Sequence, residues 1–382
     1  MSRPIPRTVA IVGGGRWGRQ IVSVLKPILS NEQRILWVTK HGNDAAQKWC
    51  VNNALDYVTC VPDLETIVCN IDAAIVANAP TEHYPAVSTL LEHSVPTFCE
   101  KPVTLSLHHA NKLVQLAELK NVAFGTNLVL DEASYLKEFT DDCAGLSIRS
   151  IEIVWHDPWC EVRHGQTKHG DFYTPMTHDM LPHCWSIMRR ILGNGFSLEL
   201  LGVDYTPQCT VITCQTQDIS ISVSLSRRAK LRIRKIKING SGSNEGDSAW
   251  LDFSQEPGFQ SVKGQTRTNQ WGDVRPLEAS LRSFFSAIES DDDQWSLSTS
   301  NCLEAVQLAE SASQLVEKDQ DHRIRRLASK RQLSADNSDH VALLIDRLAP
   351  TLASQGQRDP LLTTEQCKRF ADQCIPLVAS LL

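Results

Sequence analysis

The tripeptide Glu100-Lys101-Pro102 follows the short apolar run Val95-Pro-Thr-Phe-Cys99. Such a run predicts a buried strand, so Lys101 would lie where that strand leaves the edge of a sheet. A partly desolvated ammonium at such an edge can hold and polarise an oxygen or nitrogen of a substrate. Whether Lys101 does this chemistry depends on the groups that the rest of the chain places around it.

A glycine-rich turn near the start of the chain is the first of these groups. Thr8–Val12 is a β-branched run, and apolar residues recur at helical spacing from Ile21 onward. Between them, residues 13–18 have the G-x-G-x-x-G spacing of turns in which a helix N-terminus faces the phosphates of a dinucleotide. A purely structural glycine turn is the alternative. The cofactor contacts predicted here are Gly13, Gly15, Arg16, Trp17 and Gly18.

The next predicted strand, residues 35–39, ends in Thr39-Lys40-His41. A site that prefers NAD carries a carboxylate in this place for the ribose hydroxyls, whereas a hydroxyl and a cation suit a 2′-phosphate. The pattern therefore favours NADP(H) over NAD(H), with Thr39 and Lys40 as contacts. The alternative is that Lys40 is a solvated loop lysine.

Strands and helices alternate as far as residue 127. Asp72–Pro80 predicts a buried strand that ends in a loop, and a helix with His83 in its first turn follows. Ser106–Lys120 and Val122–Thr126 supply a further helix and strand. This alternation specifies a doubly wound parallel sheet of the Rossmann type, whose ligand lies beyond the carboxyl ends of the strands. The further cofactor candidates at these ends are Asn78, Pro80, His83, Glu100 and Lys101.

Three motifs in this order resemble the glucose–fructose oxidoreductase, inositol dehydrogenase and rhizopine-catabolism (Gfo/Idh/MocA) superfamily: the glycine turn, Ala79-Pro-Thr-Glu-His83 and Glu100-Lys-Pro102. The resemblance extends to about Lys318. It implies that Lys101 lies beside the nicotinamide and the reacting carbon, with Glu100 orienting it. It also implies a second domain with an open sheet that often forms a dimer contact, and hence a homodimer or higher homo-oligomer.

Longer β-rich segments follow residue 128, and alternation such as that from Ile219 to Leu225 predicts a sheet with one buried face. We therefore expect an α/β protein with an N-terminal Rossmann domain over residues 1–127. An α+β domain with an open, mainly antiparallel sheet is expected over residues 128–318. A linker and an extra C-terminal helical tail are expected over residues 319–382.

The partner predicted for Lys101 lies in the stretch Thr177-His-Asp-Met-Leu-Pro-His183. The family carries an Asp-x-Gly-x-His-x-x-Asp pattern here, and Asp179 and His183 match its first acid and its histidine. Four residues apart at a helix start, the carboxylate could orient the imidazole for proton exchange with a substrate hydroxyl. Leu181 and Ser186 depart from the pattern, which puts the usual sugar substrate in doubt.

Pro182 would confine the start of this helix to about Asp179. Asp179 could then be only an N-cap of the helix. In that alternative, His183 is an ordinary buried histidine.

The polar and aromatic stretch 156–173 precedes this helix. Its candidates for contacting an anionic or polyhydroxyl substrate are Arg163, His169 and Tyr173. A zinc site is suggested by the four-residue spacing of His156, Cys160 and His164. Pro158, however, breaks any helix that would align them, and the family that the chain resembles needs no metal. We therefore expect a substrate-facing loop and no metal.

The tail begins with a polar, arginine-rich segment, Asp319–Ser338, predicted to be a linker or a solvated helix. Two apolar stripes at helical spacing follow, at residues 341–352 and 367–378. Thr363 and Gln366 have the spacing of a capping box. Because roughly 45 residues are too few for an independent core, the helix pair is expected to pack on the body or on a second subunit.

The overall charge excludes some classes of partner. The 382 residues carry a formal charge of −6, which argues against a nucleic-acid surface or a polybasic membrane anchor. The basic run Arg227–Lys237 is expected to be a strand with one solvated basic face, and a track that binds phosphate groups is the alternative. The twelve cysteines stand singly, and neither a secretory signal nor a run of about 18 apolar residues is apparent. These features predict a soluble, cytoplasmic protein whose partners include neither nucleic acid nor a membrane.

The sequence therefore predicts an oxidoreductase that uses NADP(H) in preference to NAD(H). It would move hydride between nicotinamide and a carbonyl or alcohol carbon of a small polar, sugar-like substrate. Reduction of an imine or thiazoline in a biosynthetic pathway is a second hypothesis, because some members of the family perform it. A non-catalytic dinucleotide-binding regulator is a third, although the retention of Lys101 and His183 argues against it.

Overall fold

The computed structural model describes residues 6–30, 32–163, 166–241, 247–290, 295–356 and 361–378, with the backbone alone at residues 163 and 166. The chain divides into two compact units, each of which is described by itself. The first comprises Met1–Ser134 and Gly272–Gln307. The second comprises Tyr135–Trp271 and Leu308–Leu382.

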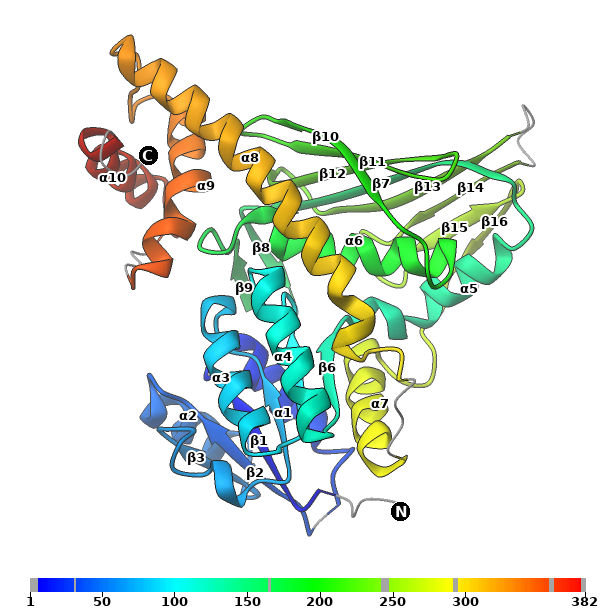
Figure 1. The fold of residues 1–382 in the computed structure, drawn as a ribbon, viewed down its shortest axis with the longest axis vertical. Helices are drawn as coiled ribbons and strands as arrows, with labels where there is room; N and C mark the ends of the chain where they lie inside the picture. Colours follow the sequence, from blue (N-terminus) through cyan, green and yellow to red (C-terminus); the bar gives the residue numbers. More distant parts are fainter. Residues whose placement is uncertain are drawn as a thin grey trace. The chain divides into compact units, whose positions relative to one another are not determined.

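Six parallel strands form the sheet of the first unit, in the order β3-β2-β1-β4-β5-β6 (Figure 1). This is the strand order of the Rossmann fold, as predicted. The strands are β1 (Thr8–Val12), β2 (Arg34–Val38), β3 (Val58–Val61), β4 (Ala73–Val76), β5 (Thr97–Glu100) and β6 (Phe124–Asn127). The connecting helices are α1 (Arg16–Leu25), α2 (Asn43–Asn52), α3 (Pro80–Glu92) and α4 (Leu107–Lys120). Residues of β4 and β5 are buried throughout, because helices cover both faces of a parallel sheet.

An aromatic cluster joins a later helix, α7 (Pro276–Ser290), to this sheet. The ring of Phe284 stacks on Phe98 of β5, with the ring centroids 5.1 Å apart. Trp295 lies 5.5 Å from Phe98 and 5.8 Å from Phe284, measured between ring centroids. All three side chains are buried. Residues 272–307 therefore complete the core of the first unit.

An eight-stranded sheet forms the centre of the second unit, in the order β10-β11-β12-β7-β13-β14-β15-β16. Strands β7 and β12 run parallel, and the other pairings are antiparallel, as predicted for an open, mainly antiparallel sheet. Its strands are β7 (Ile148–Pro158), β10 (Glu199–Tyr205), β11 (Thr210–Thr216), β12 (Ile219–Ala229), β13 (Ile233–Gly240), β14 (Ser248–Asp252), β15 (Phe259–Val262) and β16 (Gln265–Thr268). The unit also contains the hairpin of β8 (Cys160–Arg163) and β9 (Gln166–His169) and the helices α5 (Ser134–Asp142) and α6 (Met176–Leu192). Helix α6 contacts β7 and β12.

The C-terminal helices pack on the second unit. Helix α8 (Leu303–Ser329) continues well past residue 318, and α9 (Ser338–Ser354) and α10 (Thr364–Cys374) follow. Their apolar stripes share one cluster with Phe172 and Tyr205, which confirms the prediction that the pair packs on the body. The capping box of Thr363 and Gln366 is confirmed. None of the helices in the described part of the chain is both long and apolar enough to cross a membrane.

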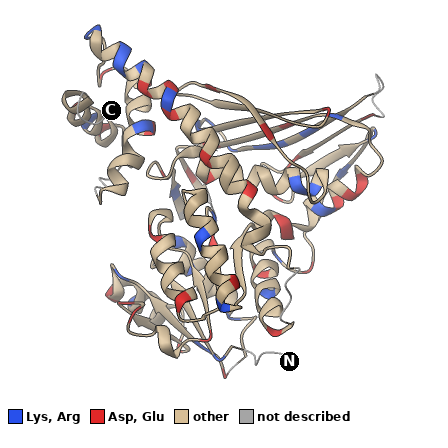
Figure 2. Cartoon of the chain, viewed as in Figure 1, with Lys and Arg blue, Asp and Glu red and all other residues tan. Residues whose placement is uncertain are grey.

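The basic run Arg227–Lys237 does not form one strand with a solvated face, so that prediction is wrong. It spans the end of β12, a turn and the start of β13. Arg227 and Arg234 are only 4% and 2% exposed, because carbonyl and carboxylate groups within the unit accept their hydrogen bonds. On helix α8, Figure 2 shows that basic and acidic residues are interspersed.

Replacing Phe284 with Ala is expected to destabilise the first unit by about 3–5 kcal/mol, because a buried ring is exchanged for a cavity. Denaturant unfolding followed by tryptophan fluorescence measures this loss. The matched control is Phe259→Ala on β15, where the ring is 45% exposed and the loss should be far smaller. Equal losses in the two variants would show that the aromatic cluster does not hold α7 on the sheet.

Candidate active site

The turn between β1 and α1 gives each glycine a different environment. Gly13 has a φ of 131°, and a Cβ there would lie 2.6 Å from backbone atoms of Ala77. A Cβ on Gly18 would lie 2.0 Å from the carbonyl oxygen of Gly13, so the helix packs directly on the turn. Gly15 faces open space at the N-cap of α1, where no side chain caps the helix. This open helix N-terminus fits the pyrophosphate of a dinucleotide.

The predicted cofactor residues of the first unit lie at one edge of its sheet. Four neighbouring strands end in register, with pairings among Val38, Val12, Val76 and Cys99. The glycine turn follows β1, Asn78 and Pro80 follow β4, and Lys101 follows β5. In an open parallel sheet this edge is where ligands bind. The fold therefore brings these residues together, although their contacts with a cofactor stay a prediction.

The residues that follow β2 differ in exposure. Thr39 is fully buried, and its hydroxyl donates a hydrogen bond to Oδ1 of Asn43 at 2.8 Å. Lys40 is exposed in the loop before α2. Next to the glycine turn, Trp17 is 37% exposed, and the guanidinium carbon of Arg16 lies 5.6 Å from the centre of its ring. Lys40 and Trp17 therefore present side chains to solvent, whereas the proton of Thr39 is used within the protein.

His83 connects two of the loops at this edge. Its Nδ1 lies 2.8 Å from the carbonyl oxygen of Pro102, and its Nε2 lies 3.2 Å from the carbonyl oxygen of Asn78. Burial lowers the pKa of His83 to about 4, against the opposing effect of these carbonyl groups. A neutral imidazole has one N–H, which donates to one of the two oxygens. His83 is thus placed to support the Glu-Lys-Pro loop.

Glu100 begins a chain of buried polar groups. Nδ2 of Asn127 donates to Oε1 of Glu100 at 2.5 Å, and Oγ of Ser280 donates to Oδ1 of Asn127 at 2.9 Å. Burial raises the pKa of Glu100 to about 7, although Asn127 and Lys101 act in the opposite direction. Sequence reasoning missed Asn127 and Ser280. The position of Asn127 at a strand end could have indicated it, whereas Ser280 comes from α7, which no motif connects to this edge.

The helix that carries Asp179 and His183 begins earlier than predicted. Helix α6 begins at Met176, with Pro175 as its N-cap, and continues through Pro182. The prediction that Pro182 limits the start to about Asp179 is wrong. A proline inside a helix removes one hydrogen bond, and here the helix is buried along most of its length, which offsets that cost. Asp179 therefore lies in the first turn, with His183 one turn further on the same side.

The surroundings of this pair come from the sheet and the hairpin of the second unit. The ring of His183 stacks on Trp155 of β7, with the ring centroids 4.7 Å apart. Oδ2 of Asp179 lies 4.0 Å from Nη2 of Arg227, and its side chain is 32% exposed. Whether the carboxylate orients the imidazole stays a prediction.

Lys168 is a charged neighbour that sequence reasoning missed. Its Nζ lies 3.6 Å from Oε1 of Glu161 and 4.0 Å from Oδ2 of Asp157. Burial lowers the pKa of Lys168, and the carboxylates of Asp157, Asp179 and Glu161 oppose this effect. The hairpin β8–β9 and the start of α6 therefore form one electrostatic cluster. No motif marks Lys168, because its partners come from separate parts of the sequence.

The candidate substrate residues of the stretch 156–173 differ in position. His169 ends β9 and pairs with Cys160 of β8. Tyr173 packs against the apolar cluster of the C-terminal helices. The side chain of Arg163 lies outside the described residues, as does His164. Within the described part of the chain, no three His, Cys, Asp or Glu side chains are grouped so as to hold a metal ion.

Comparisons with known proteins match the first unit most directly. Residues 7–128 match the model of GFO_IDH_MocA, an oxidoreductase family with an NAD-binding Rossmann fold. The inositol 2-dehydrogenase of Cereibacter sphaeroides is 23% identical over 190 residues, which are 49% of this chain and 54% of that protein. The chain thus matches about half the length of this curated relative.

Solved structures share the fold over most of the chain. The UDP-N-acetylglucosamine 3-dehydrogenase of Acidithiobacillus ferrooxidans is 14% identical, with a TM-score of 0.64 over 81% of this chain and 97% of that one. A 3-ketoreductase from Actinomadura kijaniata, in complex with NADP and TDP-benzene, is 14% identical, with a TM-score of 0.66 over 81% and 98%. At such identities the likeness shows the fold alone. Residues 7–128 therefore resemble the GFO_IDH_MocA oxidoreductases, and the chain shares the fold of these solved structures.

Proposed function

We propose that the protein is an NADP(H)-dependent oxidoreductase that moves hydride between nicotinamide and a carbonyl or alcohol carbon of a small, sugar-like substrate. The observation that carries this proposal is the common sheet edge, which holds the glycine turn, Lys40 and Lys101. The relatives named above are dehydrogenases and a ketoreductase, which supports the reaction class. They favour neither imine reduction nor a regulatory role. A homo-oligomer in the cytoplasm remains part of the proposal.

The cofactor supplies or accepts the hydride when it is bound. The chain would hold its pyrophosphate at the open N-terminus of α1, where Gly15 leaves space for close approach. Lys40 would pair with a 2′-phosphate, because it is exposed and no carboxylate stands beside it in Thr39-Lys40-His41. The absence of a Cβ at Gly13 lets this turn lie against the loop after β4.

The proposed catalytic side chains are those of Lys101, His183 and Asp179. Lys101, which is half-buried, would hold and polarise the substrate oxygen, with Glu100 fixed behind it by Asn127. His183 would exchange the proton, with Asp179 one helical turn before it as its partner. The proposed substrate contacts are Arg163, His169 and Tyr173.

The variant Lys40→Asp is expected to raise the KM for NADPH about tenfold or more, because a cation facing the 2′-phosphate becomes a repelling carboxylate. Steady-state assays with NADPH and NADH, using a panel of inositols and nucleotide sugars and their keto forms, measure the effect. Lys48→Asp makes the same charge change at an exposed position of α2 and should alter the KM little. A wild-type enzyme that prefers NADH would contradict the assignment.

The variant Lys101→Ala is expected to lower turnover by about 10²–10³-fold, because it removes the group that stabilises charge on the substrate oxygen. Binding of NADPH, followed by cofactor fluorescence, should remain nearly intact. Lys112→Ala on the exposed side of α4 is the control and should keep wild-type turnover. Turnover that is unchanged in Lys101→Ala would remove this residue from the mechanism.

Glu100 predicts a pH dependence of stability. Its pKa is raised from an ordinary value of 4.5 to about 7, so the folded protein keeps a proton that the unfolded chain loses between these values. The stabilisation is complete below about 4.5 and is lost as the pH rises through about 7. Because the lowered pKa of His83 acts in the opposite direction in both proteins, urea unfolding across this window should show the stability of the wild type falling relative to that of Glu100→Gln, which cannot ionise. Parallel curves would show that the carboxyl titrates normally.

A further inference from the structure

The C-terminal helices cover the segment that leads into the helix of Asp179. Phe172 is 1% exposed and lies in one apolar cluster with Leu344 and Leu348 of α9 and Phe370 of α10. Helix α6 begins shortly after Phe172, at Met176. The extension is therefore in direct contact with the approach to α6.

Asp346 of α9 anchors this contact with a bidentate ion pair. Its Oδ2 and Oδ1 accept hydrogen bonds from Nη1 and Nη2 of Arg228 at 2.7 and 2.8 Å. The Tyr205 hydroxyl also donates to Oδ2, at 3.1 Å. The side chains of Arg228 and Asp346 are 10% and 12% exposed, so solvent screens the pair weakly. Loss of one partner of such a pair leaves an uncompensated buried charge.

Arg227, the neighbour of Arg228 in β12, holds the other side of the segment. Its Nη1 donates to the carbonyl oxygens of Asp171 and Thr174 at 2.5 and 3.0 Å. Its Nη2 lies 4.0 Å from Oδ2 of Asp179. The guanidinium carbons of both arginines lie within 5.5 Å of the centre of the Phe172 ring. The two adjacent arginines thus connect α9 with this segment and with the carboxylate of Asp179.

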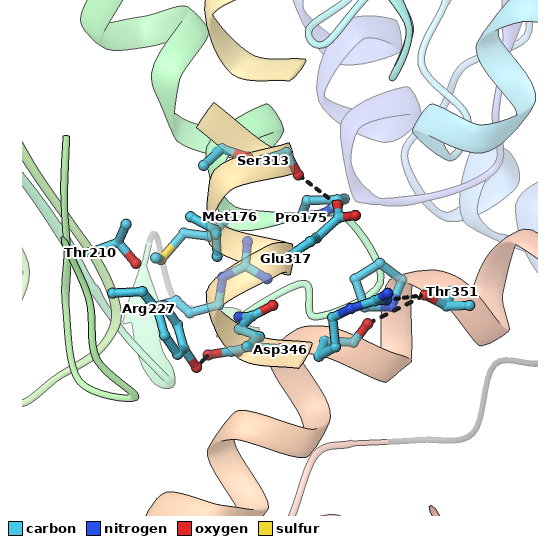
Figure 3. Close-up of a pocket in the computed structure, with 14 residues that line it drawn as sticks. Pro175, Met176, Thr210, Arg227, Ser313, Glu317, Asp346 and Thr351 are labelled. Atoms are coloured by element: carbon cyan, nitrogen blue, oxygen red, sulfur yellow. Dashed lines mark hydrogen bonds between the residues drawn. The ribbon is translucent and has the colours of Figure 1, made fainter. Parts of the chain in front are cut away.

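A small cavity interrupts the apolar packing at this point (Figure 3). Its volume is about 40 Å³, and its lining includes Met176 and Thr177 of α6, Arg227 of β12 and Asp346 of α9. Figure 3 shows Arg227 and Asp346 at this cavity, beside α8. Because packing is incomplete at this cavity, the ion pair adds a directional contact to the apolar packing of α9 near the start of α6.

We propose that Asp346 is a positioning residue for the substrate side of the site. Through Arg228 and its neighbour Arg227, Asp346 holds the segment 171–174 and the first turn of α6, and so fixes where Asp179 lies. This inference rests on the proposed function, in which Asp179 and His183 take part in proton exchange. It gives the C-terminal extension a role in catalysis as well as in folding.

The test uses Asp346→Asn in the full-length protein, which keeps the shape of the side chain and removes its charge. Amide hydrogen exchange, read by mass spectrometry, is expected to become faster in residues 171–179 and to stay unchanged in β11. With a substrate from the panel, kcat is expected to fall roughly tenfold and the KM for NADPH to stay unchanged, because small displacements of reacting groups can cost up to about 10²-fold in rate. Arg228→Lys loses the bidentate geometry and should show the faster exchange and the lower kcat more weakly. It also provides the test if Asp346→Asn does not fold.

The control is Asp339→Asn, which makes the same chemical change on the same helix. Asp339 is exposed and accepts a hydrogen bond from the side chain of Gln208 at 2.9 Å. It should keep wild-type exchange in residues 171–179 and wild-type kcat. Equal exchange in the Asp346 and Asp339 variants, or faster exchange with unchanged kcat, would overturn the positioning role. A wild-type protein without oxidoreductase activity would refute the proposed function separately, because the exchange measurement does not require turnover.

Discussion

The register of the parallel strands in the first unit is the constraint on which the rest of the proposed site depends. Strands β2, β1, β4 and β5 are neighbours and end within a residue or so of one another, as the pairing of Val12 with both Val38 and Val76 shows. Each loop that leaves these ends must therefore emerge at the same edge. Gly13 lets the glycine turn lie directly against the loop after β4, because any Cβ there would meet the backbone of Ala77. Loops from distant parts of the sequence thus meet at one edge of the sheet without long excursions.

In the second unit, buried charged side chains that no sequence motif marks connect separate strands, loops and helices. Arg227, Arg228 and Arg234 are almost completely buried, and each has an acidic or carbonyl partner. Buried ion pairs of this kind contribute little net stability, yet removing one partner is costly. In the positioning role proposed for Asp346, the value of the pair with Arg228 is geometric, because it helps to hold α9 beside a small cavity at the start of α6. The same reasoning links the C-terminal extension to the start of α6.

The sequence predicted those features that depend on local pattern. Thr8–Val12, the helix that ends at Lys120 and the capping box at Thr363 follow from β-branching, periodicity and side-chain capping, which act within a few residues. Pro182 was misread because burial in tertiary structure outweighs the local preference of proline. Asn127 and Ser280 were missed because only folding brings β6 and α7 to the side of Glu100. The basic run was misread because its partners lie elsewhere in the chain.

The transfer of deuterium from NADPH labelled at C4 tests the central claim most directly. The protein would be incubated with the labelled cofactor and a panel of keto forms of inositols and nucleotide sugars, and the products analysed by mass spectrometry. Our account predicts a reduced product that carries the label on the former carbonyl carbon, formed faster with NADPH than with NADH. A product without label, or the absence of any product with either cofactor, would contradict it.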